Sequence, residues 1–153
     1  MAEARIGLVG LGVMGANLAL NIADNGFPVV VHNRTTSVID DFIANAGDLA
    51  DRLVPAQDYA QMAAALTPPR AIIIMVKAGG PVDAVIDELK PHLDKGDIII
   101  DAGNADFNDT RRREADLKDE GYRFVGMGVS GGEEGAVEVQ VKAGGGEPRF
   151  PQP

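Results

Sequence analysis

Short apolar runs alternate along this chain with segments whose apolar residues recur at helical spacing. We expect each run to form a buried strand, because short apolar stretches bounded by turn residues are typical of strands. The expected strands cover residues 6–9, 29–32, 71–76, 98–101 and 124–127. Continuous apolar strands that alternate with helices indicate a parallel sheet covered on both faces. The pattern therefore predicts an α/β fold with a doubly wound, mainly parallel sheet.

The segments between these strands carry apolar stripes with the period of a helix. The first stripe follows a glycine-rich turn and consists of Met14, Leu18 and Ile22. Glycine or proline marks the expected ends of the later helices, because neither residue continues a helix readily. The later helices are expected over residues 38–46, 82–89 and 109–120, with a short one over 59–66.

The last part of the chain has a different pattern. Residues 137–142 alternate between apolar and polar side chains, which predicts a half-exposed strand. Three successive glycines and three prolines follow, and this composition predicts a disordered tail over residues 144–153. We therefore expect one globular domain over residues 1–143.

Composition and charge narrow the possible functions. The formal net charge is −9, which argues against a surface for nucleic acids or membranes, because those surfaces need basic patches. The absence of cysteine excludes disulfides, thiolate chemistry and cysteine metal sites, and no metal site is predicted. The first apolar run is too short to span a membrane, and the N-terminus lacks the pattern of a signal peptide. We therefore expect a cytoplasmic protein.

A glycine motif joins the first expected strand to the first expected helix. Residues 10–15 read Gly-Leu-Gly-Val-Met-Gly and so match the GxGxxG pattern of dinucleotide-binding folds of the Rossmann type. Gly10 would allow the tight turn, Gly12 would let a pyrophosphate approach the backbone, and Gly15 would let the helix pack close to the strand. The alternative is a glycine turn that binds no ligand. The strand–turn–helix context favours a nucleotide site.

The end of the second expected strand bears on the choice of cofactor. Sites that prefer NAD place an acidic residue there, which binds the ribose 2′-hydroxyl. This chain has Asn33, Arg34 and Thr35 instead. A guanidinium can bind a 2′-phosphate through paired charge-assisted hydrogen bonds, so Arg34 predicts NADP. The alternative is a capped helix start with an exposed arginine.

Four segments resemble motifs of the 6-phosphogluconate dehydrogenase family, in the order in which that family has them. They read GLGVMGANLALNIADNGFPVVVHNRTTS, MVKAGGPVD, KGDIIIDAGNADFNDTRRR and FVGMGVSGGEEGA. The resemblance covers residues 5–136. Short-chain β-hydroxyacid dehydrogenases share the glycine loop and a segment like VSGG, but they are less similar in the other motifs.

The resemblance implies a role for each matching position. Asn33, Arg34 and Thr35 would hold the 2′-phosphate, and Asn104 would lie where the nicotinamide meets the sugar acid. The cofactor would contact Gly10, Leu11, Gly12, Val13, Met14, Gly15, Asn33, Arg34, Thr35, Val76, Lys77, Ala78 and Asn104. The substrate would contact Asn104, Ser130, Gly131, Gly132 and Glu133.

Plainer interpretations of several of these residues remain open on the sequence alone. Lys77 could be a solvated loop lysine, and Asn104 could support a turn. Residues 130–132 could form a flexible connection, and Glu133 could be solvated. We expect the three arginines of residues 111–113 to form a solvated surface, and we assign no role to either histidine.

The resemblance implies oxidative decarboxylation of 6-phosphogluconate to ribulose 5-phosphate with reduction of NADP, a reaction of the pentose phosphate pathway and of gluconate use. The family's catalytic lysine and glutamate lie in a later helical domain, so we assign no catalytic residue here. The surface that would face that domain is expected to be apolar and to favour self-association. Ala102 replaces a usual glycine, and its methyl group is expected to crowd the ligand.

Two other functions are compatible with these motifs. One is a stand-alone NADP-binding or regulatory module without catalysis. The other is a fragment of a β-hydroxyacid dehydrogenase or of an imine reductase. A ligand-bound structure in which no partner chain supplies catalytic groups would favour the first. A substrate screen on the full-length parent would separate the second from 6-phosphogluconate dehydrogenase.

Overall fold

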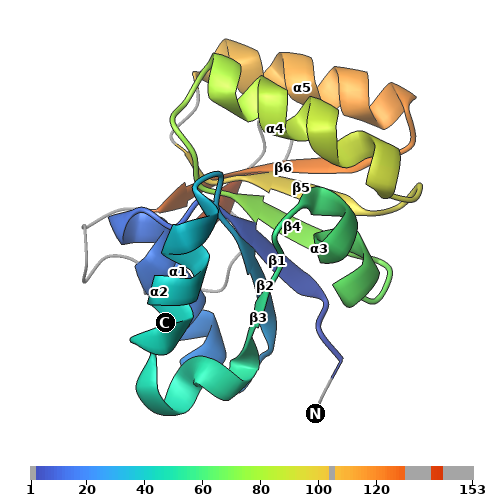
Figure 1. The fold of residues 1–153 in the computed structure, drawn as a ribbon. Coiled ribbons are helices and arrows are strands. Elements are labelled where there is room, and N and C mark those ends of the chain that lie inside the picture. Colours follow the sequence, from blue (N-terminus) through green and yellow to red (C-terminus); the bar gives the residue numbers. More distant parts are fainter. Residues whose placement is uncertain (1–2, 104–105, 130–138, 143–153) are drawn as a thin grey trace.

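The computed structural model describes residues 3–103, 106–129 and 139–142, in which strands and helices alternate (Figure 1). The strands are β1 (Ile6–Val9), β2 (Val29–His32), β3 (Leu53–Pro55), β4 (Ala71–Ile74), β5 (Ile98–Asp101), β6 (Arg123–Val129) and β7 (Val139–Lys142). The α-helices are α1 (Val13–Asp24), α2 (Thr36–Ala44), α3 (Tyr59–Ala65), α4 (Gly80–Leu89) and α5 (Phe107–Asp119). Two short 3-10 helices cover Gly47–Arg52 and Lys90–His92.

The strands form one sheet in the order β3-β2-β1-β4-β5-β6-β7. Strands β1 to β6 are parallel, and β7 pairs antiparallel with β6. Leu8 of β1 lies in register with Val31 on one side and with Ile73 on the other. The chain winds outward in both directions from β1, which confirms the doubly wound, Rossmann-type fold. In such sheets, ligands bind beyond the carboxyl ends of the strands, where the strand order reverses.

Helices cover both faces of the sheet, and each face has its own apolar core. Figure 1 shows α1 and α2 on one side of the sheet, with α4 and α5 on the other. Successive residues of β2 alternate between the two cores, because strand side chains point to opposite faces. Val29 and Val31 pack with α1 and α2, whereas Val30 packs in the core that includes residues of α3, α4 and α5.

The observed elements differ from the expected ones mainly at their ends. Strand β4 ends at Ile74, so Val76 belongs to the following loop. Strand β3 was not expected, because its apolar run is only three residues long and ends in a proline, which is uncommon within a strand. Pairing with β2 holds it in the sheet. Strand β7 lies within the alternating segment as expected, and α5 is followed by Gly121 with φ +93°. The expected tail over residues 144–153 lies outside the described residues.

An ion pair between a partly buried arginine and a buried aspartate joins the starting ends of β4 and β5. The Arg70 Nη1 lies 2.9 Å from Oδ2 of Asp97, whose side chain is buried. The Asp97 carboxylate also accepts hydrogen bonds from the backbone N–H groups of Arg70 and Asp94. The carboxylate is therefore fully paired, as a buried charge must be. This pair therefore holds the starts of β4 and β5 together, at the edge of the sheet opposite to the expected ligand edge.

The packing of α1 on β1 predicts the effect of two glycine substitutions. A Cβ atom at Gly15 would collide with the Gly10 carbonyl, whereas a Cβ at Gly12 would meet nothing within 4 Å. We expect Gly15→Ala to lower the free energy of unfolding by about 1–3 kcal/mol, the usual cost of overpacking. Gly12→Ala should lower the free energy of unfolding by less, about 0.5–1 kcal/mol, because alanine caps a helix less well than glycine. Thermal unfolding followed by circular dichroism checks both variants, and equal melting temperatures for the two would contradict this account.

Candidate functional site

The three glycines of the motif have different structural roles. Gly10 has φ +103°, and a Cβ there would collide with the Met75 carbonyl. Gly15 is buried against the Gly10 carbonyl, which brings α1 directly over the end of β1. Gly12 is exposed and has open space around its Cβ position, although its φ of −68° is open to any residue. Two of the glycines therefore shape the turn, and Gly12 leaves room above it.

The start of α1 points its free N–H groups into this open space. Gly12 caps the helix without a side-chain hydrogen bond, and the first turn carries no acidic residue. The first N–H groups of a helix have no partner within the helix, and they carry partial positive charge. The turn therefore has the geometry of an anion site, and a pyrophosphate fits its chemistry.

The side chain of Asn33 fastens this turn to the loop after β2. Its Oδ1 accepts a hydrogen bond of 2.8 Å from the Leu11 N–H, and its Nδ2 donates one of 3.2 Å to the Thr35 carbonyl. The Leu11 side chain is buried in the core below, so only its backbone faces the turn. The sequence predicts phosphate binding by Asn33 but does not reveal this contact. A role in holding the turn is thus added to the predicted one.

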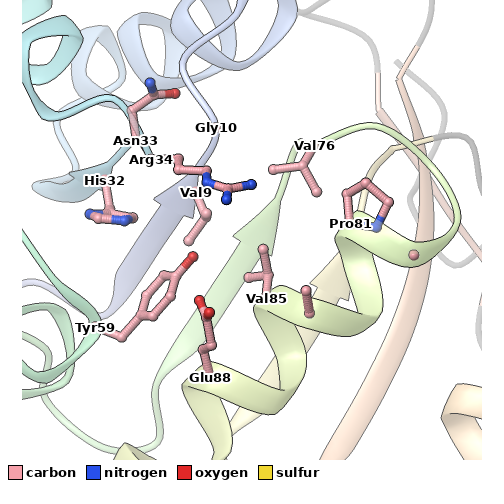
Figure 2. A pocket seen from close by; sticks show the side chains of 12 residues that line it. Val9, Gly10, His32, Asn33, Arg34, Tyr59, Val76, Pro81, Val85 and Glu88 are labelled. Carbon is pink, nitrogen blue, oxygen red and sulfur yellow. The ribbon is translucent and has the colours of Figure 1, made fainter.

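A cavity of about 530 Å³ opens beside the ends of β1 and β2. Figure 2 shows Arg34, Asn33 and His32 on one wall, with Pro81, Val85 and Glu88 of α4 on the other. A volume of this size is in the usual range of ligand pockets. The further lining residues are Val9, Gly10, Tyr59, Val76, Gly80 and Ala84.

Tyr59 lies between charged groups of opposite sign in this cavity. Burial raises the pKa of its hydroxyl, Glu88 raises it further, and Arg34 lowers it in part. The hydroxyl therefore stays protonated and can donate a hydrogen bond to a ligand. Its ring lies 4.7 Å from the buried His32 ring, whose Nδ1 is 2.8 Å from the Ala56 carbonyl oxygen.

Sequence reasoning missed Tyr59, Glu88 and His32 as lining residues. His32 is the last residue of β2, at the edge of the sheet where ligands bind, and this position in the sequence could have identified it as a lining residue. Tyr59 and Glu88 come from α3 and α4, and no motif marks them. Only the packing of these helices brings them to the cavity.

The loop after β4 lies at the same edge, as predicted. Val76 is partly buried and lines the cavity, while Lys77 and Ala78 are exposed. In the glycine turn, Val13 is 62% exposed and Met14 packs partly against the core. Arg34 and Thr35 are both exposed at the end of β2. The predicted cofactor residues among those described therefore share one edge of the sheet.

Several predicted site residues lie outside the described residues. They are Asn104, Ser130, Gly131, Gly132 and Glu133. Their binding roles stay predictions. Ala102 is described, and it is buried in the core that contains residues of α1 and α2. The expectation that its methyl group crowds the ligand is not supported, because this residue packs inward.

The expectation for the arginines of residues 111–113 is wrong for one of them. Arg113 is only 2% exposed, whereas Arg111 and Arg112 lie on the surface. Arg113 is buried because two carboxylates come to it from other elements, Asp101 from β5 and Asp83 from α4. Its hydrogen bond lowers the pKa of Asp83, while burial raises the pKa of Asp101.

Within residues 3–103, 106–129 and 139–142, no three side chains of the metal-binding types come together to hold an ion. In the same part of the chain, no helix has the length and apolar character needed to cross a membrane.

Comparison with known proteins gives closely similar sequences. The 6-phosphogluconate dehydrogenase of Synechococcus elongatus is 55% identical over 137 residues, and the human enzyme is 55% identical over 136 residues. These matches cover 90% and 89% of this chain but 29% and 28% of the relatives. The chain therefore spans less than a third of the length of these relatives.

Solved structures give the same result. The 6-phosphogluconate dehydrogenase of Plasmodium falciparum, described in complex with its cofactor NADP+ and with its substrate 6-phosphogluconate, superposes with a TM-score of 0.83 at 37% identity. The match covers 90% of this chain and 30% of that one. The 3-hydroxyisobutyrate dehydrogenase of Mycobacterium tuberculosis has a TM-score of 0.72 at 21% identity over 92% of this chain and 46% of that one, which shows a shared fold.

A family model also matches nearly the whole sequence. It describes the NAD binding domain of 6-phosphogluconate dehydrogenase and matches residues 5–152, so it continues past Ala136, where the recognisable motifs end. Together with the fold and the glycine turn, this match shows that the chain belongs to the family of NAD-binding domains of 6-phosphogluconate dehydrogenase.

Proposed function

We propose that this domain binds NADP+ and NADPH along the carboxyl edge of its sheet. The observation that carries the proposal is the position of Arg34, on the wall of a cavity that adjoins the glycine turn. The adenosine 2′-phosphate would bind Arg34, with neutral hydrogen bonds from Asn33 and Thr35. The pyrophosphate would bind the N–H groups at the start of α1.

The rest of the cavity suits an adenosine. Val76 and Val85 offer apolar contacts, and the protonated Tyr59 hydroxyl offers a donor. Glu88 offers an acceptor on the opposite wall. Lys77 and Ala78 would lie beside the adenosine and pyrophosphate.

The activity of the longer relatives suggests the reaction in which this domain takes part. We propose that, in a protein of that length, it serves the oxidative decarboxylation of 6-phosphogluconate in the cytoplasm. Bound NADP+ would supply the acceptor of the hydride. This chain would contribute Asn104, Ser130, Gly131, Gly132 and Glu133 on the substrate side, as the resemblance implies. The identity of 55% to 6-phosphogluconate dehydrogenases favours this substrate over those of the hydroxyacid enzymes, which share the fold.

The first test concerns the choice of cofactor. Arg34→Ala should weaken NADP+ binding about ten- to hundredfold, because it removes charge-assisted hydrogen bonds to the 2′-phosphate. Binding of NAD+, which lacks that phosphate, should stay nearly unchanged. Isothermal calorimetry measures both affinities. Arg5→Ala is a matched control, since this exposed arginine precedes β1 at the opposite edge of the sheet. Equal affinity of the unmodified chain for NADP+ and NAD+ would overturn the assignment.

The second test concerns turnover. None of the described residues is assigned to proton transfer, and general acid–base steps need groups within reach of the substrate. The polypeptide of these 153 residues should therefore bind NADP+ without reducing it when 6-phosphogluconate is added. Absorbance of the reduced nicotinamide measures this. NADPH formation that depends on the substrate, with host enzyme excluded by an untransformed control, would contradict the prediction.

A further inference from the structure

Two arginine–aspartate ion pairs with buried carboxylates lie at opposite edges of the sheet. Arg70 and Asp97 precede these strands and form the pair at the starting edge. Asp101 ends β5 and pairs with Arg113 of α5, with 3.2 Å between Oδ2 and Nη1. The second pair therefore lies at the edge where the glycine turn and the cavity are found.

Arg113 divides its hydrogen bonds among three structural elements. Besides the bond to Asp101 on β5, its Nε donates to Oδ1 of Asp83 on α4 at 2.9 Å. Its Nη2 donates to the Gly79 carbonyl at 3.0 Å, where the loop after β4 ends. One rigid guanidinium thus connects β5 with both the loop and the first turn of α4.

Asp101 extends this connection to the turn after β5. Its Oδ1 accepts a hydrogen bond of 3.0 Å from the Gly103 N–H. Gly103 lies against the loop after β4, since a Cβ atom there would collide with the Val76 carbonyl. The two loops are therefore in backbone contact, and Arg113 bonds to both, directly at Gly79 and through Asp101 at Gly103.

Stability alone is a poor explanation of this arrangement. A buried ion pair must overcome the cost of removing two charges from water. Apolar residues of similar size therefore often stabilise a buried position as much as an ion pair does. The planar guanidinium differs from an apolar side chain in fixing the direction of several bonds at once. The guanidinium fixes the loop that contains Val76 and the start of α4, and both of these segments line the cavity.

We propose that Arg113 is a positioning residue, which sets the loop after β4 and the start of α4 against the turn after β5 so that the cofactor meets a preformed edge. The proposal rests on the proposed function, because NADP+ is the ligand whose binding it concerns. Preformed loops lower the entropy that a ligand must lose on binding. Within the described part of the chain, Arg113 acts through Asp101, Asp83 and Gly79.

Two conservative substitutions separate positioning from stability. In Arg113→Lys the charge is kept, but an ammonium cannot span the three elements as the guanidinium does. Arg70→Lys makes the same change in the pair at the opposite edge. Both variants should melt at a lower temperature than the unmodified chain. Arg113→Lys should raise the Kd for NADP+ about tenfold, as expected for lost charge-assisted bonds, whereas Arg70→Lys should leave it within about twofold.

A second variant covers the case in which Arg113→Lys does not fold. Asp83→Ala removes the link from Arg113 to α4, together with the exposed pair between Asp83 and Arg112, but leaves the buried Arg113 paired with Asp101. Because Asp83 is partly exposed, this variant should fold, and its Kd for NADP+ should rise about threefold for one lost link.

Calorimetry with NADP+ and thermal unfolding of each variant decide between the outcomes. If the folded Arg113→Lys chain, or Asp83→Ala in its place, binds NADP+ as tightly as the unmodified chain, the positioning role is wrong. The same holds if Arg70→Lys weakens binding as much as Arg113→Lys does. Failure of the unmodified chain to bind NADP+ would instead overturn the proposed function, and with it this inference.

Discussion

The close approach of α1 to the end of β1 is the contact on which the rest of the site depends. Gly15 lies against the Gly10 carbonyl, and neither position has room for a side chain. This contact points the free N–H groups of α1 at the edge where the strand order reverses. A larger residue at Gly15 would push the helix away and would remove the anion site together with the packing.

Polar side chains from the neighbouring strands and helices hold the loops on both sides of this turn in place. Asn33 bonds to the backbone of the turn from the end of β2 and so places the adjacent Arg34 beside it. On the other side, Arg113 and Asp101 hold the loops after β4 and β5. The site is thus fixed from both sides of β1. In a chain of net charge −9, such local groups must attract an anionic cofactor, because the overall field opposes it.

Much of this arrangement could be predicted from local patterns. The apolar runs identify β1, β2 and β5 at their observed bounds, and the glycine motif identifies the turn. Arg113 was misjudged because α5 is charged on most of its surface, so its sequence does not show which arginine faces inward. That depends on carboxylates from β5 and α4, and on how these elements pack. The short β3 is stabilised by pairing with β2 rather than by its own pattern.

The most direct test of the central claim is the binding of NADP+ to Gly12→Val. This substitution fills the open space above the turn, where no atom lies within 4 Å of the added Cβ. The fold should therefore be kept, with a melting temperature lowered only slightly because valine caps a helix less well than glycine, while the pyrophosphate can no longer reach the backbone. Calorimetry should then detect no binding of NADP+, in contrast to the unmodified chain. A folded Gly12→Val variant that binds NADP+ with unchanged affinity would contradict the account.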